Sequence, residues 1–148
     1  MDKKNLTEEE TLALDDQNQR KKNLQAAKNL YKETLNANPD HVETHNNLGV
    51  ILLQLGELQE AKSSYQKAIQ INPSYASAHN NLGVVFKKLG ELEKAVSSCQ
   101  KAIQINPNYA SAHNNLAAVF YETGELQKAK NFYQKAIQIN PNYVGAHS

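Results

Sequence analysis

The sequence contains no tryptophan, one cysteine, four prolines and six glycines in 148 residues. Because Cys99 has no second cysteine to pair with, a disulfide bond within the chain is excluded. The net charge is only +1, whereas a surface that binds nucleic acid or anionic membrane usually carries a concentrated basic face. No apolar run approaches the roughly 20 residues that span a bilayer, and the amino terminus lacks the apolar segment of a secretory signal. These absences predict a cytoplasmic protein with no nucleic-acid or membrane partner.

What the sequence does contain is a repeat, and the four prolines mark its period. They stand at 34-residue intervals: Pro39, Pro73, Pro107 and Pro141. The segments 74–107 and 108–141 are identical at 23 of 34 positions, and 40–73 is a third copy. Self-similarity at a period of this length is typical of a solenoid, in which stacked units bury one another's apolar sides.

Each copy predicts two helices joined by tight turns, which makes the fold all-α. Apolar residues recur at spacings of three and four on both helices. A glycine follows the first helix, where a left-handed residue is favoured, and a glutamate begins the second: Gly56–Glu57, Gly90–Glu91 and Gly124–Glu125. An Asn-Pro pair ends the second helix. The residue after each proline is a predicted N-cap: Asp40, Ser74, Asn108 and Asn142.

The first 41 residues follow this pattern only weakly. Residues 1–7 are predicted to be disordered, and Thr7 with Glu10 forms a capping-box sequence that begins a helix over about 8–21. That helix is almost wholly polar, with only Leu12 and Leu14 as large apolar residues. A second helix over about 24–37 has an apolar stripe. We interpret the two as a degenerate opening repeat, because a terminal repeat must present a polar outer face.

The spacing of the small and apolar residues resembles the tetratricopeptide repeat (TPR). In the first regular copy the matching positions are Leu48, Gly49, Ala61, Tyr65, Ala68 and Pro73. Where the family often has tryptophan, this sequence has histidine: His45, His79 and His113. The resemblance implies a right-handed α-solenoid of stacked antiparallel helix hairpins. Its units would be a degenerate capping repeat at 8–41, regular repeats at 42–75, 76–109 and 110–143, and the start of a truncated repeat at 144–148.

Nothing in the sequence predicts catalysis, a cofactor or a metal site. Equivalent histidines of stacked repeats lie at least about 8–10 Å apart, whereas zinc ligands lie about 2 Å from the ion. The histidines are therefore interpreted as packing residues. Cys99 stands where the other copies have Tyr65 and Tyr133, so it is interpreted as a small buried residue. Without a phosphate-binding glycine loop or a Ser/His/Asp arrangement, the chain is predicted not to be an enzyme.

Asparagine pairs recur early in each first helix, although asparagine is at best neutral in helices. They are Asn46–Asn47, Asn80–Asn81 and Asn114–Asn115. The rows resemble the asparagine ladder in the TPR superhelix of O-linked N-acetylglucosamine transferase. That resemblance implies that Asn47, Asn81 and Asn115 bind the backbone of an extended peptide in a neutral concave groove, since an amide both donates and accepts hydrogen bonds. The alternative is that the amides hold neighbouring repeats in register.

Specificity for a protein partner is predicted where the copies diverge near the groove. Lys87 and Lys88 in one copy correspond to Tyr121 and Glu122 in the next. The TPR domains that clamp the acidic tail of heat-shock chaperones carry basic residues at positions that are Asn46, Ser111 and Asn115 here. We therefore predict no such clamp.

Three functions remain open at this stage. The first is a protein-interaction module or scaffold that binds a peptide, and the second is the substrate-recruiting part of a larger transferase. The third is end-to-end association of copies. Residues 142–148 repeat the beginning of a first helix and then the sequence stops. We therefore expect a fragment of a longer protein, whose last helix lacks its cover and can stack on another copy.

Overall fold

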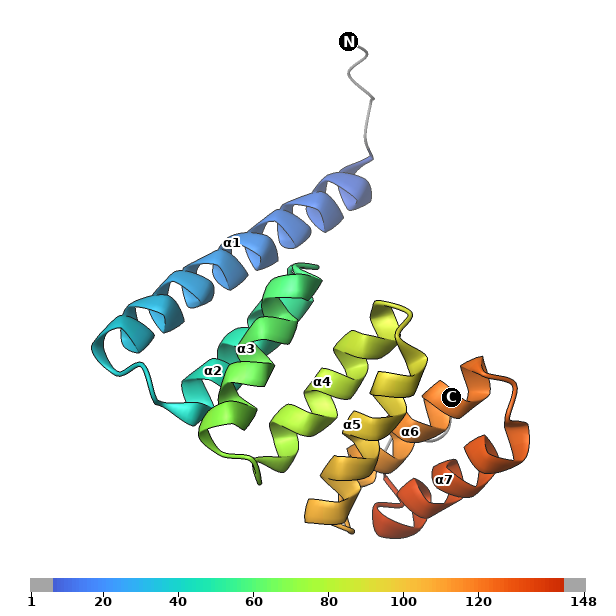
Figure 1. Ribbon diagram of the computed structural model, residues 1–148. Coiled ribbons are helices and arrows are strands. Elements are labelled where there is room, and N and C mark those ends of the chain that lie inside the picture. The colour runs from blue at the N-terminus through green and yellow to red at the C-terminus, as the bar shows by residue number, and fades with distance from the viewer. Residues whose placement is uncertain (1–6, 143–148) are drawn as a thin grey trace.

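The computed structural model describes residues 7–142, and all regular structure in that range is helical (Figure 1). The helices are α1 (Glu8–Ala37), α2 (Val42–Gln54), α3 (Leu58–Ile71), α4 (Ala76–Lys88), α5 (Leu92–Ile105), α6 (Ala110–Glu122) and α7 (Leu126–Ile139). Three hairpins, α2–α3, α4–α5 and α6–α7, stack in chain order. The predicted all-α solenoid of helix hairpins is confirmed. The expectations for residues 1–6 and 143–148 lie outside the described residues.

The turn inside each hairpin depends on its glycine. Gly56, Gly90 and Gly124 have φ values of 78°, 78° and 82°, a conformation that costs other residues energy because of their Cβ. In the first hairpin, Gly56 N–H donates to the Leu53 carbonyl and Glu57 N–H donates to the Leu52 carbonyl. The other two hairpins have the same pair of bonds, which satisfy the last carbonyls of the first helix. The predicted left-handed caps are therefore confirmed.

The turn between hairpins differs from the prediction by one residue. The N-caps of α2, α4 and α6 are His41, Tyr75 and Tyr109, so the expected N-caps Asp40, Ser74 and Asn108 are wrong. Before α2, the His41 ring itself accepts the Thr44 backbone N–H at 3.2 Å and so caps the helix. Before α4 the reason is a side-chain turn: the Asn72 amide oxygen accepts the Ser74 backbone N–H at 3.1 Å. Asn106 and Asn140 repeat this contact with the residues two positions later. The residue after the proline is thus held in the turn, and the helix begins after it.

The opening segment does not form the expected hairpin. The predicted turn between 21 and 24 is wrong, because α1 is one helix of 30 residues. Lys22 stands where the regular copies have their turn glycine. The predicted capping box does begin α1: Glu10 N–H donates to Thr7 Oγ1 at 3.1 Å, and Thr7 N–H donates to Glu10 Oε2 at 3.2 Å. The carboxyl half of α1 packs on the first hairpin, where Tyr31 and Leu35 contact the core.

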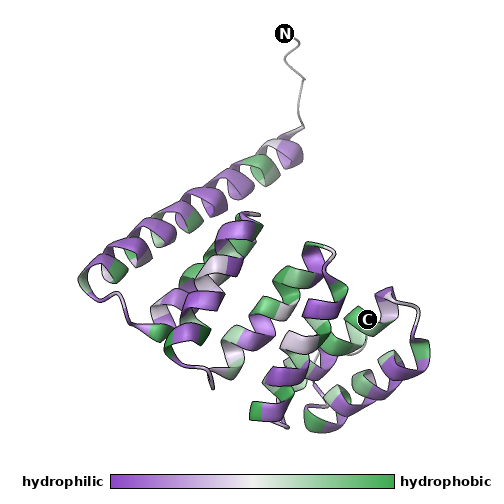
Figure 2. Ribbon diagram, in the orientation of Figure 1, coloured by the Kyte–Doolittle hydropathy of each residue, from purple (hydrophilic) through white to green (hydrophobic). Residues whose placement is uncertain are grey.

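Small residues bring the two helices of a hairpin together. A Cβ added to Gly49 would lie 2.5–2.8 Å from the Tyr65 ring, and one added to Gly83 would lie 2.6 Å from Cys99 Sγ. Alanines on the second helices are fully buried beside them: Ala61, Ala68, Ala95 and Ala102. Figure 2 shows hydrophobic residues along the helices of the regular hairpins, whereas α1 is hydrophilic over most of its length.

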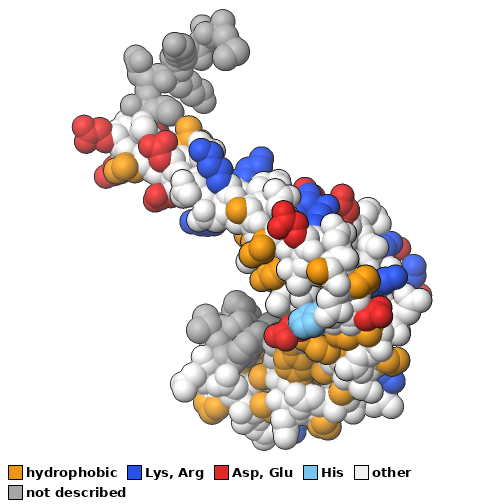
Figure 3. Space-filling view, turned by 90° about the vertical axis from the view of Figure 1, so that its left-hand side faces the viewer, with side chains coloured by type: hydrophobic (Ala, Val, Ile, Leu, Met, Phe, Trp, Pro, Cys, Tyr) orange, Lys and Arg blue, Asp and Glu red, His pale blue; other side chains and the backbone are white. Residues whose placement is uncertain are grey.

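The array is curved, with the first helices on its inner side. Within the described residues, the backbone of α4 approaches both α2 and α6, whereas α3, α5 and α7 make no such contacts with one another. The second helices are therefore spread apart on the outer side. Figure 3 shows the resulting curved molecule with a hollow on one side. We call the surface formed by α2, α4 and α6 the concave face.

Candidate functional site

The asparagine pairs of α2, α4 and α6 form two rows with different environments. We call Asn46, Asn80 and Asn114 the inner row, and Asn47, Asn81 and Asn115 the outer row. Asn46 and Asn80 are only 6% and 3% exposed. Asn114 and all three residues of the outer row are half-buried. The two rows therefore differ in how far a guest molecule can reach them.

The inner row connects neighbouring repeats. Asn46 Nδ2 donates to Ser77 Oγ at 3.2 Å, and Asn46 Oδ1 accepts a bond from Asn81 Nδ2 at 3.2 Å. Asn80 makes the same contacts one repeat later, with Ser111 at 3.1 Å and with Asn115 at 2.8 Å. These bonds fit the alternative in which the amides hold repeats in register. The serine partners, 31 residues after each asparagine, were missed by the sequence reasoning, although they recur at the repeat period.

The outer row keeps hydrogen-bonding capacity. Asn81 and Asn115 use their Nδ2 groups on the inner row, but neither Oδ1 accepts a bond from a described residue. Asn47 makes no side-chain hydrogen bond within the described part of the chain. The outer row therefore presents one amide oxygen per repeat on α2, α4 and α6. Its role in binding a peptide stays a prediction.

The predicted specificity residues lie at the carboxyl ends of α4 and α6. Lys87 Nζ lies 3.6 Å from Glu122 Oε1, so these two side chains form an ion pair between the helices. Lys88 is exposed, and Tyr121 is 65% exposed. The structure thus brings Lys87 and Glu122 together as an ion pair and leaves Lys88 and Tyr121 accessible.

Apolar side chains occupy the positions that the sequence predicts to line the groove. Val50 and Leu53 on α2, Val84 on α4 and Ala118 on α6 are half-buried rather than covered. Val50 and Leu53 also pack against the core cluster. These positions therefore place small apolar side chains on the same helices as the neutral amides of the outer row.

The repeated histidines form hydrogen bonds with the turns that precede their helices. The Nε2 atoms of His45, His79 and His113 lie 2.7, 2.8 and 2.9 Å from the carbonyl oxygens of Pro39, Pro73 and Pro107. Because a carbonyl only accepts, each Nε2 carries the proton and donates. His113 also stacks on Phe132, with ring centroids 5.9 Å apart. Among residues 7–142 no group of three or more His, Cys, Asp or Glu side chains is placed to hold a metal ion.

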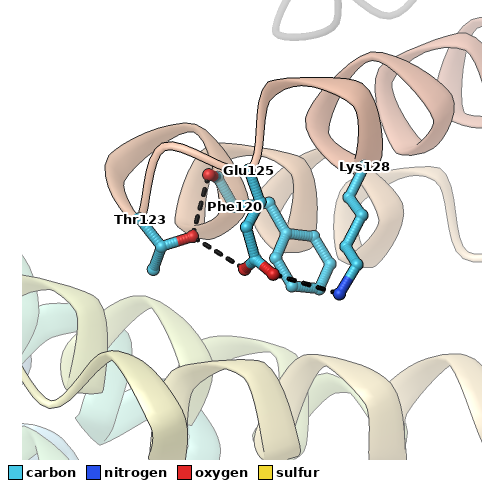
Figure 4. A network of polar contacts seen from close by, with 4 residues as sticks. All are labelled: Phe120, Thr123, Glu125 and Lys128. Carbon is cyan, nitrogen blue, oxygen red and sulfur yellow. Dashed lines mark hydrogen bonds and ion pairs between the residues drawn. The ribbon is translucent and has the colours of Figure 1, made fainter.

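Cys99 and the helix-start glutamates also have structural explanations. Cys99 is fully buried, as predicted, and burial raises the pKa of its thiol to about 12. Figure 4 shows the Glu125 carboxylate between Thr123 and Lys128 in the turn before α7. The hydrogen bond from Lys128, followed by that from Thr123, lowers the pKa of Glu125. Lys128 also lies 5.3 Å from the centre of the Phe120 ring.

Family comparisons agree with the repeat architecture. Three family models match the chain: one described as TPR repeat over residues 51–90, and two described as tetratricopeptide repeat over 74–142 and 30–63. No curated protein matches the sequence significantly. None of the described helices is both long and apolar enough to cross a bilayer.

Solved structures show the same fold. The crystal structure of MamA is similar over 89% of this chain and 77% of its own, with a TM-score of 0.77 and 32% identity. YrrB, described as a TPR protein with an unusual peptide-binding site, is similar over 86% of this chain and 66% of its own (TM-score 0.75, 24% identity). The first TPR of Spaghetti, solved with an HSP90 peptide, is similar over 72% of this chain and 84% of its own (TM-score 0.69, 23% identity).

Proposed function

Because the chain belongs to the tetratricopeptide repeat family, we propose that its concave face binds an extended segment of another protein. The observation that carries this proposal is the outer row, whose Oδ1 atoms accept no hydrogen bond within residues 7–142. An extended guest has unpaired backbone N–H groups, which are the donors that these oxygens lack. Asn47, Asn81 and Asn115 would each hold one point of the guest backbone.

Two proteins of similar fold give this proposal a precedent. YrrB is described as having a peptide-binding site, and the first TPR of Spaghetti was solved with a bound HSP90 peptide. Both likenesses are of fold, so the proposed contacts rest on the amides of this chain. The likeness to the superhelix of O-linked N-acetylglucosamine transferase likewise rests on the asparagine rows alone.

The chemistry of the groove favours a neutral guest. The amides of Asn46 and Asn80 are committed to the scaffold, and Lys87 is paired with Glu122. Positions that would need basic residues to clamp an acidic tail are Asn46, Ser111 and Asn115. The chain would recognise the guest by its backbone and by apolar side chains that contact Val50, Leu53 and Val84. Binding should therefore depend little on salt concentration.

Three amide contacts support only modest affinity. A neutral hydrogen bond contributes about 1 kcal/mol net, and the guest must also lose conformational freedom when it binds. Three such bonds with limited apolar burial predict a dissociation constant of roughly micromolar or weaker. The module would thus form a reversible complex.

The test uses a peptide selected for binding to this chain from a displayed random library. Asn47→Ala removes an amide that has no intramolecular partner, so we expect unchanged thermal stability and about fivefold weaker binding. The triple replacement of Asn47, Asn81 and Asn115 with alanine should weaken binding by about 100-fold.

Asn80→Ala is the matched control. It removes a buried amide that holds α4 to α6, so it should lower stability by about 1–3 kcal/mol. At temperatures where the variant stays folded, the peptide should lose much less affinity than with the triple variant, because Asn80 only positions Asn115 and does not itself hold the peptide. If the selected peptide binds the triple variant with unchanged affinity, the outer row does not hold it and the proposal is wrong.

A further inference from the structure

The amino half of α1 overhangs the carboxyl end of α2. Each second helix of a regular hairpin begins just after a turn glycine, whereas α1 extends past the equivalent position, Lys22, to Glu8 (Figure 1). Between this overhang and α2 lies an open cleft of about 480 Å³. Its wall on α1 includes Gln17, Asn18, Arg20 and Lys21, and the end of α2 contributes Gln54 and Leu55. We call this space the overhang cleft.

The overhang cleft contains cations but no carboxylate. Residues 17–32 include no acidic residue, and neither does the stretch 44–56, which forms most of α2 and the turn after it. We call Arg20, Lys21 and Lys22 the basic run. All three are exposed, and none of them makes an ion pair with a carboxylate of the described residues. The charge of the basic run is therefore not compensated by a neighbouring side chain.

The other polar groups of the cleft are also uncommitted. Gln17, Asn18 and Gln54 are exposed and make no side-chain hydrogen bond within the described part of the chain. By contrast, Gln19, which does not line the cleft, donates to Asn23 at 3.1 Å. The two cations of the cleft donate no hydrogen bond to the last carbonyls of α2, so they do not cap that helix. The hydrogen-bonding groups of the cleft are thus available to a guest.

A second hollow adjoins the overhang cleft along α1. It has a volume of about 610 Å³, is lined in part by Lys22, and shares Asn18 and Lys21 with the overhang cleft. Leu24 and Leu55 are half-buried at the overhang cleft, so apolar surface accompanies the charge. Two adjoining hollows with apolar surface suit a segment of several residues better than a single ion.

The sequence itself does not supply the missing carboxylates. The acidic residues at the beginning of α1, Glu8 to Glu10, lie on the same straight helix, at least about 15 Å from Arg20 along its axis. Outside the described range the sequence has one acidic side chain, Asp2, which is followed by two lysines. The occupant of the overhang cleft therefore comes from another molecule.

The charges on α1 favour a short acidic peptide over a long polyanion. Five exposed carboxylates precede the basic run on this helix: Glu8, Glu9, Glu10, Asp15 and Asp16. A nucleic acid or an anionic membrane would meet these carboxylates as well as the cations, and like charges repel. A short peptide can contact the basic run alone.

We propose that the overhang cleft binds a short acidic segment of another protein. Carboxylates of the segment pair with Arg20 and Lys21, and the planar guanidinium holds one of them through two parallel hydrogen bonds. An apolar side chain of the segment packs against Leu24 and Leu55. The site is separate from the outer row, and its binding depends on charge, whereas the guest of the concave face is neutral.

The experiment uses the full chain and the peptide GLEELEEG, labelled with a zwitterionic rhodamine, as the probe. Fluorescence anisotropy at low ionic strength should show saturable binding that weakens about tenfold or more when salt is added. The neutral peptide GLQQLQQG should bind at least about tenfold more weakly. Arg20→Gln combined with Lys21→Gln should weaken binding of the acidic probe about tenfold. Because both residues are exposed and unpaired, circular dichroism should show an unchanged helix content.

Lys67→Gln combined with Lys101→Gln is the matched control. These lysines are exposed on α3 and α5 and make no ion pair within residues 7–142, so the variant loses the same charge elsewhere. It should bind the acidic probe as tightly as the parent chain does. The triple alanine variant of the outer row should also bind it with unchanged affinity, which separates this site from the concave face. Arg20→Glu combined with Lys21→Glu should instead bind the basic peptide GLKKLKKG.

Three results would overturn the proposal. The first is absence of saturable binding, or an equal loss of affinity in the matched control. The second is tighter binding of a DNA duplex or of phosphatidylserine vesicles that the double glutamine variant at positions 20 and 21 loses, because a phosphate-bearing surface would then be the occupant. The third is a concentration-dependent dimer that the same variant dissociates, because the acidic residues 8–10 of a second copy would then fill the cleft.

Discussion

The opening helix and the regular hairpins occupy the same 34-residue frame but fold differently. In the first hairpin Ala61, Tyr65 and Ala68 are fully buried beneath α2. Their counterparts on α1, namely Ala27, Tyr31 and Thr34, are half-buried or exposed, because residues 8–20 run straight on instead of folding back. Two positions explain the difference: Lys22 replaces the turn glycine, and Asp15 replaces Gly49. A repeat of this type therefore needs a left-handed turn and a gap for the facing side chain.

The largest expected effect comes from placing aspartate, the residue that α1 has at position 15, at the equivalent position 49 of the first hairpin. Gly49→Asp would place a carboxylate against the Tyr65 ring, which already lies within 2.8 Å of an added Cβ. Steric overlap and burial of a charge together should lower the free energy of unfolding by at least about 3 kcal/mol. Urea unfolding followed by circular dichroism measures this change.

A graded control separates the steric part from the charge. Gly49→Ala adds only the Cβ, and Ala117 shows that alanine is accepted at this position in the third hairpin, where it is fully buried. The alanine variant should lose about 1–2 kcal/mol. If the aspartate variant were no less stable than the alanine variant, burial of charge would not explain why α1 forms one long helix and not a hairpin.

The second prediction concerns the turn alone. Gly90→Lys places the residue of position 22 at a φ of 78°, and no atom lies within 4 Å of the added Cβ. The cost is therefore confined to the backbone and should be about 1–2 kcal/mol. Gly90→Ala should cost nearly the same, since the strain arises from the Cβ. A much larger loss for lysine would show that side-chain contacts decide the turn.

The regular hairpins could be predicted because their signals are local. Period, turn glycine and helix-start glutamate each act within a few residues, so Gly56 and Glu57 were placed correctly. The prediction of two helices in the opening repeat was wrong because that segment has Lys22 at the position of the turn glycine. The roles of the asparagines could not be predicted. Whether Asn46 bonds to a guest or to Ser77 depends on side-chain geometry between repeats, which spacing does not fix.

The third prediction concerns α1 and introduces there the two glycines that the first and second hairpins have. Asp15→Gly combined with Lys22→Gly removes the obstructing carboxylate and supplies a turn residue, and each glycine also weakens the helix by about 1 kcal/mol. Spin labels on Ala13→Cys and Glu33→Cys should lie about 30 Å apart in the parent helix. In the double-glycine variant, a population of molecules should show the two labels about 8–10 Å apart, which is the distance between packed helices.

Labelling for this measurement spares the native thiol. Cys99 is fully buried, and burial raises its pKa to about 12, so it stays protonated and unreactive near neutral pH. The single variant Lys22→Gly retains Asp15 and serves as the control for helix fraying alone. A distance that stays near 30 Å in the double variant would show that further residues of α1, such as Glu10, also prevent the hairpin.

The smallest expected effect concerns the ion pair that joins α1 to the first hairpin. Its hydrogen bond with Glu57 raises the pKa of Lys28, and the same bond lowers the pKa of Glu57. The stabilisation from Glu57 is therefore complete at pH values above the ordinary pKa of a glutamate, and it is lost as the pH falls through the lowered pKa of Glu57. The stabilisation from Lys28 is complete at pH values below the ordinary pKa of a lysine, and it is lost as the pH rises through the raised pKa of Lys28.

Lys28→Met keeps the apolar stem of the side chain and removes the charge. We expect a slightly lower melting temperature near neutral pH, and a flatter dependence on pH at both the acidic and the alkaline limit. Lys94→Met is the matched control, because Lys94 pairs with Glu91 at 3.4 Å inside a single turn and its side chain is 64% exposed. The control should shift the melting temperature less, since its ion pair joins no two repeats and is screened by solvent. Equal effects of the two substitutions would mean that α1 is held to the hairpin by Tyr31 and Leu35 alone.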